Sequence, residues 1–137
     1  MTCFPRSFAT AALLAVSLFA AVPASAAPSA PCAECGMIVD PGSKFYAQVT
    51  LEGKTLAFCD IGDLLTYLIK KQLSTARAEV KDHTTGEWIS ADKAFYVRSE
   101  KTFKTPMGWG IAAFKKKVEA AAFGAPLDSK GILRAMK

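Results

Sequence analysis

The amino-acid sequence predicts an α+β protein whose two halves carry a similar order of elements, preceded by a cleavable signal segment. Three observations lead to this prediction. Short runs of β-branched and aromatic residues alternate with turn residues, apolar residues recur twice at helical spacing, and the first 26 residues have the composition of an export signal. The 137 residues fit about one domain.

The signal peptide is predicted over residues 1–26. Arg6 supplies a short positive region, an apolar run follows, and Ala24-Ser25-Ala26 is a small-residue cleavage site. The apolar run is shorter than the roughly 20 residues of a transmembrane helix, so we expect no stable membrane insertion. An uncleaved signal that anchors the chain is the alternative. The mature domain covers residues 27–137.

The charge pattern and the polar residues exclude several functional classes. Arg6 is the only charge in the signal, so the mature chain has a net charge of +4, one unit below that of the whole sequence. The two signs are scattered and no basic strip is interleaved with aromatics, so we expect no nucleic-acid partner. Asp60, Asp63 and Asp82 read as helix caps and solvated charges. A single histidine and no catalytic motif indicate that the protein is not an enzyme.

The first half reads as strand, strand, helix, strand. Residues 45–51 and 54–59 are β-branched and aromatic around a tight turn, which predicts a hairpin. Asp60 is placed to cap a helix over residues 61–72, where leucines recur at helical spacing. Residues 78–81 fit a third strand.

The second half repeats this order less clearly. Residues 87–89 and 94–97 are short strand candidates that follow a Thr-Thr-Gly turn. Apolar residues that share one helix face predict a helix over residues 111–123, ended by Gly124. A short helix is expected from Ser129.

The cysteine count points away from a pure disulfide framework. Cys3 leaves with the signal, and Cys32, Cys35 and Cys59 remain. An odd number in an exported protein means that at least one thiol is free, bound to a metal or paired with another chain.

The sulfur-bearing residues indicate a soft metal. Residues 32–37, Cys-Ala-Glu-Cys-Gly-Met, place two thiols and a thioether close together. Such donors select Cu(I), Zn(II) or iron–sulfur clusters over hard cations. Met107 lies in a loop between Pro106 and Gly108, within reach of a metal held by these thiols if the loop folds over them. Met37 fits a position in the hydrophobic core as well as the role of a metal ligand. For Met107 the sequence leaves open whether the side chain is a ligand or a core residue.

Zinc binding and thiol redox chemistry are the alternatives. Cys32, Cys35, Cys59 and His83 together would form a Cys3His zinc set. Cys59 also reads as a small buried residue. A CxxC motif exchanges disulfides in thioredoxin-type proteins, where it opens a helix after a strand; here it follows a Pro-rich linker.

Taken together, these motifs resemble the NosL family of nitrous oxide reductase accessory proteins. The matching stretches cover nearly all of the mature chain and include residues 32–37, 58–60, 80–82, 86–91, 94–97 and 105–114. Members are typically lipoproteins, whereas the residues before Cys32 are Pro-Ser-Ala-Pro and form no lipid-attachment signal. We therefore expect a periplasmic form without a lipid anchor.

The resemblance implies a periplasmic Cu(I)-binding metallochaperone. It implies two ββαβ modules packed together, which we place at about 32–82 and 83–137. Motif matching assigns copper to Cys32, Cys35, Met37 and Met107. The implied partners are a copper-receiving enzyme, nitrous oxide reductase or a related copper enzyme, and an upstream copper donor.

Overall fold

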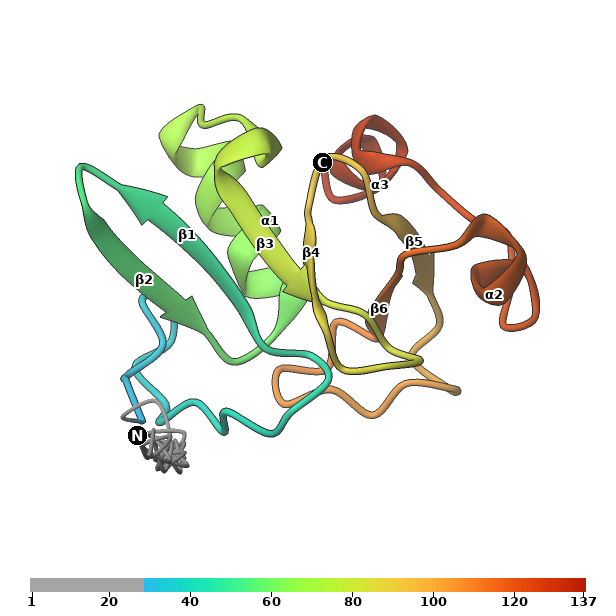
Figure 1. The fold of residues 1–137 in the computed structure, drawn as a ribbon, viewed down its shortest axis with the longest axis horizontal. Coiled ribbons are helices and arrows are strands. Elements are labelled where there is room, and N and C mark those ends of the chain that lie inside the picture. Colours follow the sequence, from blue (N-terminus) through green and yellow to red (C-terminus); the bar gives the residue numbers. More distant parts are fainter. Residues whose placement is uncertain (1–28) are drawn as a thin grey trace, which may run out of the picture.

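The computed structural model describes residues 29–137, so the predicted signal over residues 1–26 lies outside the described part of the chain. The described residues form two small antiparallel sheets and three α-helices, and Figure 1 shows the helices beside the sheets. A one-turn 3-10 helix, η1 (Thr75–Arg77), precedes β3. The strands and helices are β1 (Ala47–Leu51), β2 (Lys54–Phe58), α1 (Ile61–Lys71), β3 (Ala78–Lys81), β4 (Trp88–Ser90), β5 (Phe95–Arg98), β6 (Ile111–Phe114), α2 (Lys117–Ala121) and α3 (Ser129–Ala135).

The larger sheet has the strand order β2-β1-β3-β4, with every neighbouring pair antiparallel. The β1–β2 hairpin turns at Glu52 and Gly53, both with positive φ, and its register pairs Val49 with Leu56. Ala47, Val49 and Val80 are fully buried because α1 packs on this face of the sheet. The predicted hairpin and third strand are therefore confirmed.

Helix α1 begins and ends as its sequence predicts. The Asp60 side chain caps it by accepting a hydrogen bond of 3.0 Å from the Gly62 amide. The helix ends at Gln72, which adopts the left-handed conformation. Leu64, Leu65 and Leu68 are buried along one face, and this apolar face holds the helix against the sheet.

The second half has the same order of elements around a smaller sheet. Strands β5 and β6 pair antiparallel, and α2 follows them. Leu127 then forms an antiparallel bridge with Tyr96 of β5, as β3 pairs with β1 in the first half. This arrangement confirms the α+β class and the similar order of the two halves. The boundary between residues 82 and 83 stays a prediction, and β4, which follows it in sequence, pairs with the first sheet.

The predicted helix over residues 111–123 is wrong. Ile111–Phe114 is strand β6, and α2 is limited to Lys117–Ala121. Strand β6 lies between β5 and a parallel bridge from Asp82 to Ala113, and all four of its residues are buried. A strand covered on both faces loses the alternation that distinguishes it from a helix in the sequence.

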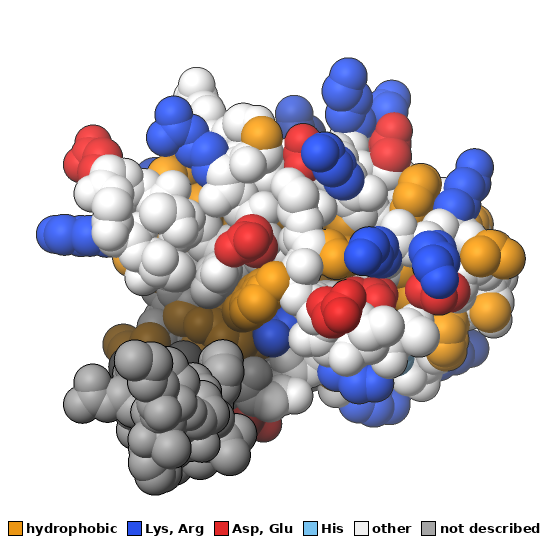
Figure 2. All heavy atoms as spheres, viewed as in Figure 1, with side chains coloured by type: hydrophobic (Ala, Val, Ile, Leu, Met, Phe, Trp, Pro, Cys, Tyr) orange, Lys and Arg blue, Asp and Glu red, His pale blue; other side chains and the backbone are white. Residues whose placement is uncertain are grey.

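The surface carries both signs of charge. Figure 2 shows basic and acidic side chains spread over one face, with apolar side chains between them on the side of α2. Val118 and Phe123, at this helix, are 74% and 43% exposed. Within residues 29–137, no helix is both long and apolar enough to cross a membrane.

Candidate metal centre

The N-terminal segment forms a tight turn that places Cys32 and Cys35 side by side. The Cys32 amide donates to the Met37 carbonyl at 2.7 Å, and the Gly36 amide donates to the Cys32 carbonyl at 2.9 Å. Gly36 has φ of +77°, a conformation that favours glycine. The turn is attached to the larger sheet because Cys32 forms a parallel bridge with Ala57 of β2.

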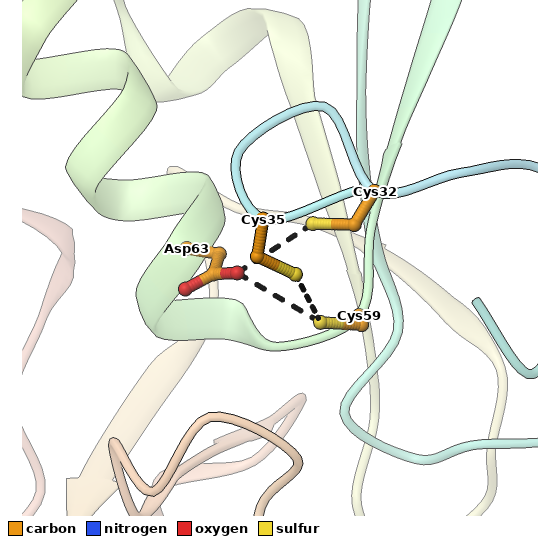
Figure 3. A group of neighbouring side chains, drawn as sticks. All are labelled: Cys32, Cys35, Cys59 and Asp63. Atoms are coloured by element: carbon orange, nitrogen blue, oxygen red, sulfur yellow. Dashed lines mark hydrogen bonds between the residues drawn. The ribbon is translucent and has the colours of Figure 1, made fainter. Parts of the chain in front are cut away.

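The bridge with β2 brings a third thiol and a carboxylate to this turn. Cys59 follows β2, and Asp63 lies four residues later in the first turn of α1. Cys35 Sγ and Cys59 Sγ are 3.4 Å apart, and Asp63 Oδ2 lies 3.5 Å from Cys32 Sγ and 3.8 Å from Cys59 Sγ. Figure 3 shows the four side chains pointing toward one another.

The geometry of this group fits one small cation. One ligand atom from each of Cys32, Cys35, Cys59 and Asp63 lies within 4.8 Å of all the others. Sulfur atoms bound at about 2.3 Å in a tetrahedral site are about 3.8 Å apart. Three of the separations here are 3.4, 3.5 and 3.8 Å, so the donors need to shift by no more than about 1 Å to share an ion. We call the three cysteines Cys32, Cys35 and Cys59 the thiol group.

The thiols of this group are free and shielded from solvent. Cys32 and Cys59 are buried, Cys35 is half-buried, and all three are unpaired cysteines. Burial raises the pKa of the Cys35 and Cys59 thiols, because a thiolate without a counter-ion is disfavoured in a low dielectric. Cys35 and Cys59 therefore keep their protons near neutral pH in the metal-free protein, and a bound cation must displace them.

The two predicted thioether ligands, Met37 and Met107, make backbone hydrogen bonds to residues of the thiol-bearing turn and of the start of α1. The Met37 carbonyl accepts from Cys32, and the Met107 amide donates to Asp60 Oδ2 at 3.0 Å. Their side chains are 48% and 43% exposed, respectively. Met37 therefore does not occupy a core position, and coordination by the two thioethers stays a prediction.

His83 does not join the cysteines, so the Cys3His set of the zinc alternative is not assembled. Its ring is surrounded by phenyl rings, the nearest being Phe103 and Phe114 with centroids at 5.1 and 5.5 Å. Its Nδ1 is buried without a hydrogen-bond partner. Asp63 takes the fourth place beside the thiols instead.

The prediction of solvated charges is also wrong for Asp63 and Asp82, which are 3% and 1% exposed. Asp82 accepts hydrogen bonds from the Thr85 hydroxyl and the Lys115 amide. Asp60 is a helix cap as predicted, but it is buried as well.

Two residues of the site were not predicted from the sequence. The Trp109 indole donates to Asp63 Oδ1 at 2.9 Å, beside the thiol group. A signal for Asp63 was present, since it lies in the first turn of the helix that Asp60 caps, four residues after Cys59. No comparable signal marks Trp109, because its contact depends on the folding of a distant loop onto α1.

The fold and this site define a small protein of two α+β modules with a cysteine-rich group suited to a soft metal ion. The NosL family model matches residues 23–132, and the chain therefore belongs to the NosL family. The crystal structure of the copper chaperone NosL from Shewanella denitrificans has the same fold, with a TM-score of 0.66 and 22% sequence identity. The alignment covers 82% of this chain and 96% of that one. No curated protein matches the chain.

Proposed function

We propose that this protein is an exported copper chaperone that carries Cu(I) on its sulfur atoms and delivers it to a copper enzyme. The single observation that carries the proposal is the convergence of three free thiols and a carboxylate within 4.8 Å. Membership of the NosL family and the copper chaperone of the same fold support copper as the cargo. The predicted signal over residues 1–26 supports export to the periplasm.

The proposed ligands are the thiolates of Cys32 and Cys35 and the thioethers of Met37 and Met107. Cys59 extends this set, because its sulfur is 3.4 Å from that of Cys35. Thiolates hold a soft cation tightly, while thioethers bind without competing for a proton. A mixed set therefore suits an ion that must later be released.

Delivery is supported by the unequal burial of the sulfur atoms. Cys59 is 4% exposed, Cys35 is half-buried, and the two methionines lie at the surface. A recipient can thus replace the outer donors one at a time while the inner thiols still hold the ion. We propose nitrous oxide reductase, or a related copper enzyme, as that recipient.

Anaerobic titration of the reduced protein with Cu(I) against a chromophoric chelator tests this proposal. We expect one tightly bound Cu(I). Replacing Cys35 by Ser should weaken binding by more than the roughly 10–100-fold that outer partners of a metal cost. Met107→Leu should weaken Cu(I) binding and leave Zn(II) binding unchanged, while Met136→Leu is the matched control. Equal Cu(I) affinity in the Met107 variant would show that this thioether is not a ligand.

Zinc is the outcome that would overturn the choice of cargo. Zn(II) also accepts three thiolates and a carboxylate. If the purified protein holds zinc that excess Cu(I) under reducing conditions does not displace, the thiol group is a structural site. Transfer is tested separately, by measuring the copper content of metal-free nitrous oxide reductase after incubation with the loaded protein.

A further inference from the structure

The two oxygens of Asp63 face different parts of the chain. Oδ2 lies 3.5 and 3.8 Å from the sulfur atoms of Cys32 and Cys59. Oδ1 accepts a hydrogen bond of 2.9 Å from the indole of Trp109, which is 46 residues away in sequence. The carboxylate therefore stands between the thiol group and the loop that carries Met107.

The indole reaches Asp63 because helix α1 has no side chain at Gly62. A Cβ atom at that position would lie 2.0 Å from Trp109 Cγ, so the ring rests directly on the helix backbone. Nearby, Asp60 Oδ2 accepts from the Met107 amide at 3.0 Å. The Met107 loop is thus attached to the start of α1 at two points, both of them carboxylates.

The Met107 loop is also braced internally. The Gly108 amide donates to the Thr105 carbonyl, and the Gly110 amide donates to the Thr105 hydroxyl, both at 3.1 Å. Gly108 and Gly110 adopt positive φ, and a Cβ at Gly110 would meet the Glu100 backbone at 2.6 Å. Because the turn is closed on itself, we expect a displacement of Trp109 to be transmitted to Met107.

We infer that Asp63 is a positioning residue that holds the Met107 loop beside the thiols through the Trp109 indole. The indole bond to Oδ1 keeps the carboxylate, and with it the loop, in place. The inference rests on the proposed function, because it takes the thiol group as the copper site.

The first experiment measures the position of the indole without metal. Trp88, the second tryptophan, packs on Tyr46 and Lys81 in the sheet, away from this loop. In the Trp88→Phe protein the emission therefore comes from Trp109 alone. We expect Asp63→Ala to shift this emission to the red and to increase its quenching by acrylamide. Asp63→Asn retains an acceptor oxygen and should restore the parent emission, while Glu79→Ala is the carboxylate control.

The second experiment asks whether Asp63 acts through Met107. In the Trp88→Phe protein, Asp63→Ala should weaken Cu(I) binding by about ten-fold, as outer partners of metal ligands do. In the Met107→Leu background the same change should cost less than about two-fold, because the two effects overlap. Trp109→Phe keeps an aromatic side chain and removes the donor, so it should reproduce the effect of Asp63→Ala in a folded protein.

The outcomes separate this inference from the proposed function. Additive effects of Asp63→Ala and Met107→Leu, or an Asp63→Asn protein as weak as Asp63→Ala, would overturn the positioning role in favour of direct coordination. Unchanged emission in Asp63→Ala would overturn it as well, even if copper binds. If the Trp88→Phe protein binds no Cu(I), the proposed function is wrong, and the metal-free emission still decides whether Asp63 holds the indole.

Discussion

The contact between Gly62 and Trp109 allows a sharp test of how the two halves of the molecule are joined. In a Gly62→Ala protein the new Cβ would lie 2.0 Å from Cγ, 2.4 Å from Cδ1 and 2.5 Å from Cβ of Trp109. Carbon atoms in ordinary contact are about 3.5–4.0 Å apart, so the ring must move by more than about 1 Å. That movement breaks the indole bond to Asp63.

The cost follows from these contacts. Overpacking costs about 1–3 kcal/mol, and loss of a hydrogen bond to a carboxylate costs about 1.5–3 kcal/mol. Alanine favours a helix over glycine by up to about 1 kcal/mol, which offsets part of this. We therefore expect a loss of about 2–4 kcal/mol in the free energy of unfolding, or a fall in Tm on the order of 10 °C.

Urea unfolding of the two proteins measures this difference. Gly42→Ala is the matched control, because a Cβ at Gly42 would meet its nearest neighbour at 3.4 Å, an ordinary contact. That variant should stay within about 0.5 kcal/mol of the parent. A Gly62→Ala protein as stable as the parent, with unchanged Trp109 emission, would refute the packing of the Met107 loop on α1.

Two further predictions concern titration and thiol reactivity. Burial lowers the pKa of His83, the Lys44 charge lowers it further, and the Asp82 charge partly opposes both. As the pH falls, the unfolded chain therefore takes up this proton before the folded chain does. The free energy of unfolding should decrease as the pH drops from about 6.5 toward the pKa of His83 in the folded protein. His83→Phe should remove this pH dependence and raise the free energy of unfolding by about 1 kcal/mol, because no buried nitrogen is then left without a hydrogen bond. Urea unfolding at pH 8 and at pH 5.5 measures both effects. Iodoacetamide should modify Cys35 before Cys32 and Cys59, which are 3% and 4% exposed. Bound Cu(I) should slow the modification of Cys35. Mass spectrometry measures the rate at each cysteine, and faster modification of Cys59 than of Cys35 would contradict the order of burial.

The sequence predicted the first half of the fold well because local signals agree there. The alternation over residues 45–51, the tight turn and the Asp60 cap each specify one element, and the structure contains all of them. The second half was harder for a physical reason. Strand β6 is buried on both faces, so its residues lack the polar–apolar alternation that would distinguish a strand from a buried helix.

The site could be predicted only in part, because its members come from separate segments. The CxxC spacing of Cys32 and Cys35 is a local signal that indicates a soft-metal site without any knowledge of the fold. Cys59 becomes their neighbour only because the N-terminal segment bridges to β2. The roles of Asp63 and Trp109 depend on tertiary packing, because the sequence alone does not distinguish a buried carboxylate from a solvated one.

The bridge between Cys32 and Ala57 has a second consequence for the chain. Strand β2 is the outer strand of its sheet, and the Ala33 amide donates to the Ala57 carbonyl at 2.8 Å. The segment that carries the thiols thereby occupies hydrogen-bonding groups that would otherwise be open to a strand of another molecule. Detaching this segment would uncover these groups, and we expect the exposed edge to favour self-association.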